Sequence, residues 1–209
     1  ADLSHLPLGQ DDAPLGLRLA QLMDPTECTT QGLHDGTAAG MRQHIESEVA
    51  MLIPARLSSF LLAHDAEYDI QRHRHSRSSS DSAHAAHVPP HQLAKAVVLE
   101  DETGCVMAVV PADRYVRLGR VSQLLARQHL RLADENRIAS LFPDCERGAV
   151  PALGMVWGLE TVVDDELETL SVVYIECGDH ERLLRLDHRQ FHALTQQARH
   201  GQFSGLRIH

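Results

Sequence analysis

The chain has 209 residues, of which 43% are hydrophobic and 23% are charged, a balance that predicts a folded globular protein rather than a disordered one. Its formal net charge of -10 argues against a protein that coats nucleic acid non-specifically, because such proteins need a strongly basic surface. No apolar run is long enough to cross a bilayer and the four cysteines are widely spaced, so we expect a cytoplasmic protein with reduced thiols and no membrane contact.

The first part of the chain differs in composition from the rest. Residues 1–48 mix Pro, Gly, Asp and Thr, and residues 1–50 contain eight acidic side chains against two basic ones. We predict a partly ordered N-terminal extension over 1–48, a candidate docking segment for a synthetase or another protein, followed by one main domain over 49–209. Apolar residues at three- and four-residue spacing over 41–64 predict a helical region that is interrupted at Pro54.

Strand and helix patterns alternate irregularly through the main domain. The segment 71–90 is rich in His, Ser and Arg, and we expect Ser79 or Ser80 to cap a short helix that runs through Ala83 and Ala86. LAKAVVLE and CVMAVVPA flank an acidic turn with a glycine, which predicts a β-hairpin. Helical patterns follow over 116–129 and 134–141, and then come the strand patterns LETVVD, LSVVYIEC and ERLLRL and a last helix after Asp187. This order predicts an α+β fold with a mixed, largely antiparallel β-sheet core surrounded by helices.

Three features are candidates for chemistry. Lys95 lies in an apolar run, and because a buried ammonium group is costly, its side chain either reaches solvent at a strand edge, the commoner case, or faces a polar pocket. The stretch GAVPALG over 148–154 is typical of a turn, but its glycines also let backbone amides approach a ligand closely. His180 follows Gly178 and Asp179 at the end of a strand, where an imidazole either sits in a hairpin turn or relays a proton.

Fifteen histidines raise the question of a metal site, and four of them, His73, His75, His84 and His87, lie in one segment. Zinc sites need several converging ligands, and no His-Glu-x-x-His motif is present, so we predict neither a metal nor a cofactor. The sequence also lacks a nucleophile elbow, a phosphate-binding loop and a dinucleotide fingerprint. Serine hydrolases, nucleotidases and dehydrogenases are therefore not supported.

The order of these features resembles the YbaK family, which also occurs as the editing domain inserted into bacterial prolyl-tRNA synthetases. The resemblance extends from about Pro54 to Phe203 and rests on SSSDSAHAAHVPPHQLAKAVVLED, VMAVVPADRYV, LADENRIASLFPDCERGAVPALG, VVDDEL and YIECGDHERLLRL. It implies an α+β domain that deacylates mischarged aminoacyl-tRNA, acting as a free-standing trans-editing hydrolase on the ester at the tRNA 3′ end. Aminoacyl-tRNA is then the expected partner.

The resemblance also implies roles for particular residues. Lys95 matches the family's strand lysine in the acyl pocket and His180 matches its late Gly-x-His element, so both are expected to be catalytic. Lys95 would support the ester electrostatically, and His180 would position a water or a hydroxyl group. The family's Gly-x-x-x-Pro loop is matched imperfectly, because the proline comes one residue early here. The expected substrate-binding residues are His73, Gly148, Ala149, Val150, Pro151, Gly154, Gly178 and Asp179.

Two other functions remain open on the sequence. The first is a non-catalytic module that binds an amino acid or a tRNA end with the same pocket and docks a partner through its acidic N-terminal extension. The second is a metal-dependent hydrolase that uses the His-rich segment, and it predicts inhibition by chelators.

Overall fold

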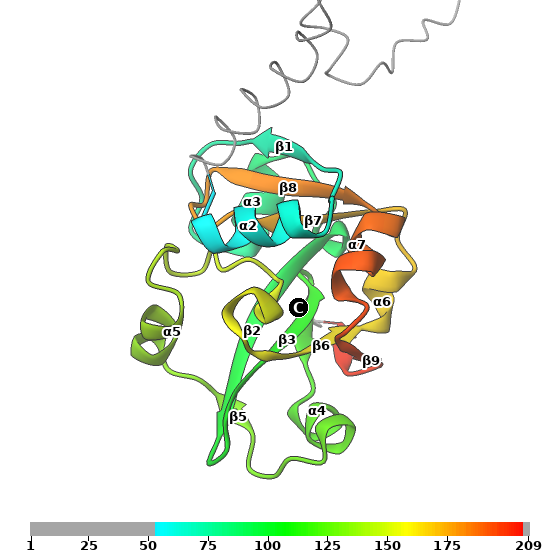
Figure 1. Cartoon of the computed structure of the whole chain (residues 1–209). Helices are drawn as coiled ribbons and strands as arrows, with labels where there is room; N and C mark the ends of the chain where they lie inside the picture. Colours follow the sequence, from blue (N-terminus) through cyan, green and yellow to red (C-terminus); the bar gives the residue numbers. More distant parts are fainter. Residues whose placement is uncertain (1–52, 207–209) are drawn as a thin grey trace, which may run out of the picture. The chain divides into compact units, whose positions relative to one another are not determined.

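The computed structural model describes residues 53–206, and Figure 1 shows how their helices and strands are arranged. The predicted extension over 1–48 lies outside the described residues, as does the beginning of the predicted main domain. The described helices include no segment that is long and apolar enough to span a membrane.

A mixed sheet of eight strands forms the centre of the described part, in the order β1-β8-β7-β2-β3-β6-β9, with β5 paired to β2. The pairs β1·β8, β8·β7, β2·β3 and β2·β5 are antiparallel, whereas β7·β2, β3·β6 and β6·β9 are parallel. β4 and β10 form a separate two-stranded sheet. The strands are β1 (Asp69–Arg72), β2 (Leu93–Asp101), β3 (Gly104–Pro111), β4 (Arg114–Val116), β5 (Arg131–Leu132), β6 (Glu160–Asp164), β7 (Val172–Glu176), β8 (Arg182–Asp187), β9 (Arg199–Gly201) and β10 (Ser204–Leu206).

Six α-helices within residues 53–206 surround the sheet, which confirms the predicted α+β class. Side chains of α2 and α7 enter the largest apolar cluster, those of α4 enter a second one and those of α3 a third. The helices are α2 (Ala55–Ala63), α3 (Ser79–Ala85), α4 (Leu118–Leu125), α5 (Glu135–Leu141), α6 (Asp165–Glu168) and α7 (His188–Thr195), with short 3-10 turns at η3 (Pro90–Gln92) and η4 (Gly154–Trp157).

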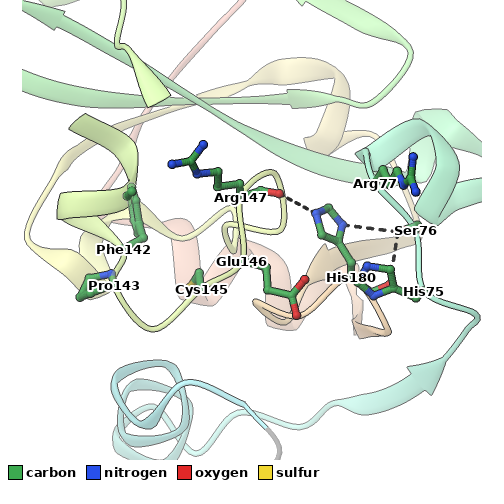
Figure 2. A pocket seen from close by; sticks show the side chains of 10 residues that line it. His75, Ser76, Arg77, Phe142, Pro143, Cys145, Glu146, Arg147 and His180 are labelled. Carbon is green, nitrogen blue, oxygen red and sulfur yellow. Dashed lines mark hydrogen bonds between the residues drawn. The ribbon is translucent and has the colours of Figure 1, made fainter. Parts of the chain in front are cut away.

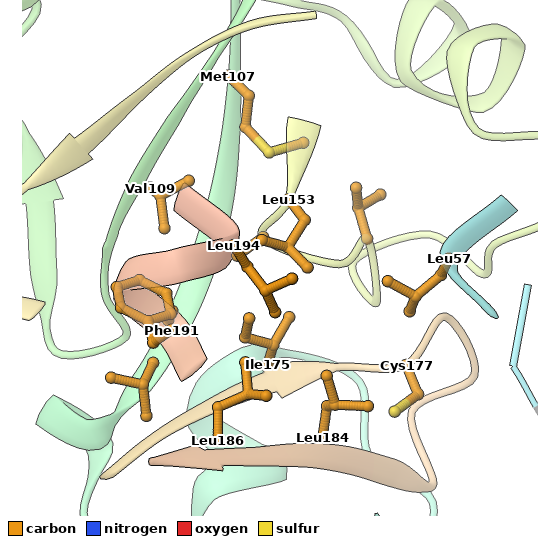
Figure 3. Close-up of a cluster of buried hydrophobic side chains, with 14 of the residues drawn as sticks. Leu57, Met107, Val109, Leu153, Ile175, Cys177, Leu184, Leu186, Phe191 and Leu194 are labelled. Atoms are coloured by element: carbon orange, nitrogen blue, oxygen red, sulfur yellow. The ribbon is translucent and has the colours of Figure 1, made fainter. Parts of the chain in front are cut away.

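The largest apolar cluster lies on one face of the sheet (Figure 3). Leu57 of α2 and Phe191 of α7 reach it from the helices, while Met107, Ile175 and Leu184 reach it from the strands. All five side chains are fully buried, and each contributes roughly 1.5 to 3 kcal/mol of transfer free energy. This cluster stabilises the strands whose ends carry the candidate site residues.

The parallel pairing of β2 with β7 determines which side chains share a face. Leu93 pairs with Tyr174 and Ala94 with Ile175, so Lys95 and Glu176 are the next residues along the two strands. Side chains alternate between faces along a strand. Ala94 faces the largest cluster, whereas Leu93 packs in the α3 cluster, so Lys95 and Glu176 project to the side of the sheet that α3 covers.

Several predicted elements agree with the structure and one is shorter than expected. β2 and β3 form the predicted hairpin, with Asp101 paired to Gly104 at its end. Pro54 stands at the N-cap of α2, as its interruption of the helical pattern indicated. The helix predicted over 116–129 covers only α4, because Ala126 adopts a left-handed conformation at φ 54° and ends it.

Asp164 joins the end of β6 to the C-terminal strand. Its buried carboxylate accepts hydrogen bonds from the amides of Phe203 and Ser204 at 2.8 and 2.7 Å and from the Ser204 hydroxyl at 2.8 Å, and it caps α6 through Glu166. Several donors therefore depend on one acceptor group.

We expect Asp164→Asn to lower the free energy of unfolding by about 1.5 to 3 kcal/mol, since the amide nitrogen cannot accept these hydrogen bonds. Urea denaturation measures the loss. The neighbouring Asp165→Asn, which removes a carboxylate without such partners, is the control and should change stability by less than about 0.5 kcal/mol. Equal losses in both variants would contradict this role for Asp164.

Candidate functional site

A cavity of about 490 Å³ opens between the loop that precedes α3, the segment around the end of α5, and the turn between β7 and β8 (Figure 2). Phe142 forms part of its apolar wall, and in this view the Arg147 and Arg77 side chains lie on opposite sides of His180. Glu146 supplies the only carboxylate in the lining. The lining residues are His75, Ser76, Arg77, Ala139, Phe142, Pro143, Cys145, Glu146, Arg147 and His180.

His180 is the one predicted catalytic residue that lines this cavity. Its side chain is buried at 3% exposure, and its backbone has a φ of 56°, a left-handed conformation that is strained for a residue with a Cβ. Nε2 lies 2.7 Å from the carbonyl oxygen of Arg147, and Nδ1 lies 3.4 Å from the Ser76 hydroxyl. Because a carbonyl group only accepts, Nε2 carries a proton and the ring holds the loop in place.

Gly148 is held against this imidazole. Its φ of 88° favours glycine, and a Cβ at this position would lie 3.2 Å from Nε2 of His180. The other predicted loop residues Ala149, Val150, Pro151 and Gly154 are buried and do not line the cavity. A Cβ on Gly154 would lie 2.6 Å from the Thr161 hydroxyl, so this glycine serves close packing.

The remaining predicted binding residues shape the turn before β8. A Cβ on Gly178 would lie 2.9 Å from Pro54, and its φ is 102°. Asp179 accepts from the amides of Glu181 and Arg182 and forms a 2.9 Å ion pair with the Arg182 guanidinium. The amide of His73 donates to the carbonyl of Glu181. None of the three predicted residues lines the cavity, but together they position His180.

Lys95 is half-buried on β2 and does not line the cavity. Its ammonium group donates to the carbonyl oxygens of Ala112, at 3.1 Å, and Arg114. These carbonyl groups replace part of the hydration that the ammonium group loses on burial. The lysine therefore faces a polar environment on the α3 side of the sheet, within the protein.

Glu176 was not among the predicted site residues. It is 1% exposed, and neither carboxylate oxygen has a hydrogen-bond partner in the part of the chain that the structure describes. Burial raises the pKa of this carboxyl group to about 7; nearby Asp179 raises it further and Ser82 opposes the shift. The available signal was a carboxylate inside the apolar strand YIEC, just before Gly178.

The cysteine in the lining is not activated. Burial and the neighbouring carboxylate of Asp144 raise the pKa of Cys145 to about 12, so its sulfur remains a thiol at neutral pH. Within residues 53–206, no group of three or more His, Cys, Asp or Glu side chains is placed to hold a metal ion. The chemistry available at the cavity therefore consists of two imidazoles, two guanidinium groups, the Ser76 hydroxyl, the Glu146 carboxylate and backbone groups.

Comparison with known proteins identifies the family. The model of the aminoacyl-tRNA editing domain family matches residues 73–194, more than half of the chain. The chain therefore belongs to the aminoacyl-tRNA editing domain family, which confirms the predicted resemblance and the editing function at the level of the family. A search of curated proteins finds no match.

Solved structures share the fold at low sequence identity. A candidate trans-editing enzyme for prolyl-tRNA synthetase is 22% identical, with a TM-score of 0.63 over 72% of this chain and 96% of that one. The hypothetical protein APE2540 is 21% identical, with a TM-score of 0.64 over 72% and 99%. A candidate signal transduction protein from Marinobacter aquaeolei VT8 is 23% identical, with a TM-score of 0.56 over 73% of this chain and 31% of that one.

The raised pKa of Glu176 predicts a pH-dependent loss of stability. In the unfolded chain this carboxyl group loses its proton near pH 4.5, whereas in the folded protein it keeps it until about pH 7. Between these pH values the unfolded state binds fewer protons, so stability falls as the pH rises. Relative to Glu176→Gln, we expect the wild type to lose roughly 3 kcal/mol of unfolding free energy between pH 4 and pH 8.

Chemical denaturation of both proteins across this pH range measures the difference. The control is Glu181→Gln, which removes an exposed carboxylate from the same turn and should follow the wild-type curve. Parallel curves for wild type and Glu176→Gln would show that Glu176 is ionised at the same pH in both states.

Proposed function

We propose that this protein hydrolyses the ester bond between a wrongly attached amino acid and the terminal ribose of tRNA. The observation that carries the proposal is that the family match over 73–194 contains every residue that lines the cavity. The substrate is then mischarged aminoacyl-tRNA, which the protein would encounter in the cytoplasm. A synthetase contact through residues 1–48 remains a prediction.

The charges of the cavity suit the 3′ end of an RNA. Arg77 and Arg147 have no carboxylate partner among residues 53–206, and both are exposed at the cavity. Guanidinium groups bind phosphate oxygens in a bidentate manner. In this proposal they hold the phosphates next to the terminal adenosine, while the wall around Phe142 receives the adenine or the amino acid side chain.

The reaction needs positioning more than a protein nucleophile. An aminoacyl ester is already activated, so an oriented water and donors for the developing oxyanion supply the rate enhancement. His180 keeps the Arg147–Gly148 backbone aimed at the cavity, and Lys95 contributes positive charge from β2. Backbone amides around Gly148 are the candidate oxyanion donors.

Lys95 is the only lysine in a chain that contains eighteen arginines. Histidines aside, every other basic side chain is an arginine. Lys95, the exception, lies on the central strand β2. An ammonium group is compact and can donate in three directions, whereas a guanidinium group is planar and wider. This supports a specific role for Lys95 that charge alone does not explain.

A binding module without catalysis is the second candidate. It is favoured by one observation, namely that both ring nitrogens of His180 already have protein partners. A hydrolase that uses His180 directly must break one of these contacts during the reaction. Such a module would bind aminoacyl-tRNA and leave the ester intact.

A panel of mischarged tRNAs incubated with the purified protein separates these two functions. We expect loss of the acyl group for one amino acid across several tRNAs. Lys95→Met, which keeps an unbranched side chain one atom shorter but removes the charge, should lower the rate about 100-fold or more. Lys95→Arg is the matched variant that keeps the charge, and it should restore only part of the rate.

Circular dichroism and thermal unfolding show whether these variants remain folded. Undiminished deacylation by folded Lys95→Met would remove Lys95 from the mechanism. Binding of every substrate without hydrolysis would replace the deacylase by the binding module.

The contact between Gly148 and His180 gives a second test. Gly148→Ala places a methyl group 3.2 Å from Nε2 of His180, and we expect it to displace the loop and lower deacylation about tenfold or more. Gly158→Ala is the control, because Gly158 also has a positive φ, 73°, but nothing lies within 4 Å of its Cβ position. Equal effects of both variants would assign the loss to backbone strain alone.

A further inference from the structure

A row of three arginines, Arg72, Arg74 and Arg77, leads from the edge of the sheet to the cavity. The segment 70–80 that contains them has no acidic residue, in a chain whose net charge is -10. Arg72 ends β1, and Arg77 belongs to the cavity lining. Figure 2 shows His75, Ser76 and Arg77 on one continuous stretch of chain beside the cavity. The row therefore extends the positive charge of the cavity outwards.

Backbone hydrogen bonds hold this segment in place beyond the end of β1. The amide of His73 donates to the Glu181 carbonyl at 2.8 Å, and the amide of Ser76 donates to the His180 carbonyl at 3.1 Å. The chain is thus anchored on both sides of Arg74, whose side chain is exposed. Because the backbone is already ordered, a ligand that binds along it loses less conformational entropy than it would on a free loop.

The row carries charge that the folded protein leaves uncompensated. Arg72 lies directly opposite Arg182 in the antiparallel pair β1·β8, and like charges in such positions destabilise a sheet. Asp179 forms an ion pair with Arg182 at 2.9 Å and so neutralises only one of the two. Arg72, Arg74 and Arg77 have no carboxylate partner within residues 53–206. An anion bound along the row would relieve this repulsion.

Two carboxylates near the row have basic partners of their own. Glu181 faces Nδ1 of His75 at 3.8 Å, and both side chains are exposed. Asp69, at the start of β1, pairs with Arg185 of β8 at 3.0 Å. Neither acid forms an ion pair with the three arginines of the row, which keep their charge for a ligand.

We propose that the row binds the phosphate groups of the RNA strand that ends in the cavity. The identity of this ligand rests on the proposed function. The terminal nucleotide lies in the cavity with Arg77 and Arg147 on the phosphates next to it, and Arg74 and then Arg72 bind the phosphates that precede them. The row is thus a binding surface for a single-stranded 3′ end.

The length of the row limits how much RNA it binds. An extended chain from Arg72 to Arg77 spans at most about 17 Å. A stacked strand rises about 3.4 Å per nucleotide, so the row covers about five nucleotides at most. This matches an end of the RNA rather than a long duplex.

Charged side chains on an edge strand also prevent pairing between the sheets of different molecules. That role ends where the strand ends. β1 stops at Arg72, whereas Arg74 and Arg77 lie beyond it and Arg77 reaches the cavity. The continuation past the edge strand favours a ligand that the row shares with the cavity.

Binding of an RNA hairpin that ends in the single-stranded 3′ end of tRNA, without an amino acid, tests the row independently of catalysis. Each phosphate contact on a single strand contributes about 0.7 to the slope of log K against log salt concentration. Arg72→Gln/Arg74→Gln should therefore reduce the magnitude of this slope by about 1.4, and Arg74→Gln alone by about 0.7. Fluorescence anisotropy with the full chain at several salt concentrations measures the slopes.

Arg120→Gln/Arg189→Gln is the matched control. It removes two exposed arginines, on α4 and α7, and changes the net charge by the same amount. Its salt slope should equal that of the wild type. Thermal unfolding shows that each variant is folded, and the single variant Arg74→Gln decides the question if the double variant is not.

The same variants report on the reaction. Aminoacyl-adenosine carries the ester but none of the preceding phosphates, so the ratio of kcat/KM for aminoacyl-tRNA to kcat/KM for aminoacyl-adenosine isolates the contribution of the row. We expect this ratio to fall about tenfold or more in Arg72→Gln/Arg74→Gln and to stay at the wild-type value in the control.

Three results would each overturn the row: a wild type that does not bind the hairpin, an unchanged slope in Arg72→Gln/Arg74→Gln, or an equal loss in the control. Hydrolysis of both substrates at one ratio in every variant would also overturn it and leave the deacylase intact. The expected changes of slope in a protein that hydrolyses neither substrate would support the row and remove the deacylase.

Discussion

The hydrogen bond between the His180 ring and the Arg147 carbonyl ties together the two segments that make the cavity. These residues are separated by 33 positions in the chain, and the bond holds the loop after α5 against the turn that follows β7. Gly148 packs closely beneath the imidazole, where a Cβ would lie 3.2 Å from Nε2. The Glu146 amide, which donates to the Gly178 carbonyl at 2.8 Å, joins the same two segments, and the Ser76 hydroxyl near Nδ1 also orients the ring.

Unfavourable local features gather around that contact. His180 and Gly148 have positive φ values, and Glu176 is buried without a hydrogen-bond partner among the described residues. Each costs free energy, and proteins keep such costs where a site needs them. The apolar cluster on the opposite face offsets these costs, since β7 and the core strand β3 are buried there by side chains such as Ile175 and Met107. A well-packed sheet can therefore support strained residues beyond the ends of its strands.

The sequence predicted the features that depend on local residue patterns. The hairpin of β2 and β3 followed from two apolar runs around an acidic turn, and His180 stood out beside Gly178. The lining residues His75, Ser76 and Arg77 were not predicted, because Ser76 meets His180 across 104 positions and no local signal reports such a contact. Glu176 was not predicted as a site residue for a related reason, since its burial depends on the packing of α3 over β7. The family resemblance, rather than periodicity, supplied the function.

The distribution of charge indicates how such a protein can meet RNA. A net charge of -10 repels a long phosphate backbone, yet the cavity carries two guanidinium groups against a single carboxylate in its lining. In the proposed function, the net negative charge disfavours contact along the length of an RNA, and the two guanidinium groups at the cavity favour contact with its end. Screening by salt weakens both effects, but a partly enclosed cavity is screened less than an exposed surface. In the proposed function, selectivity for a terminus depends on the position of the arginines at the cavity and not on their number.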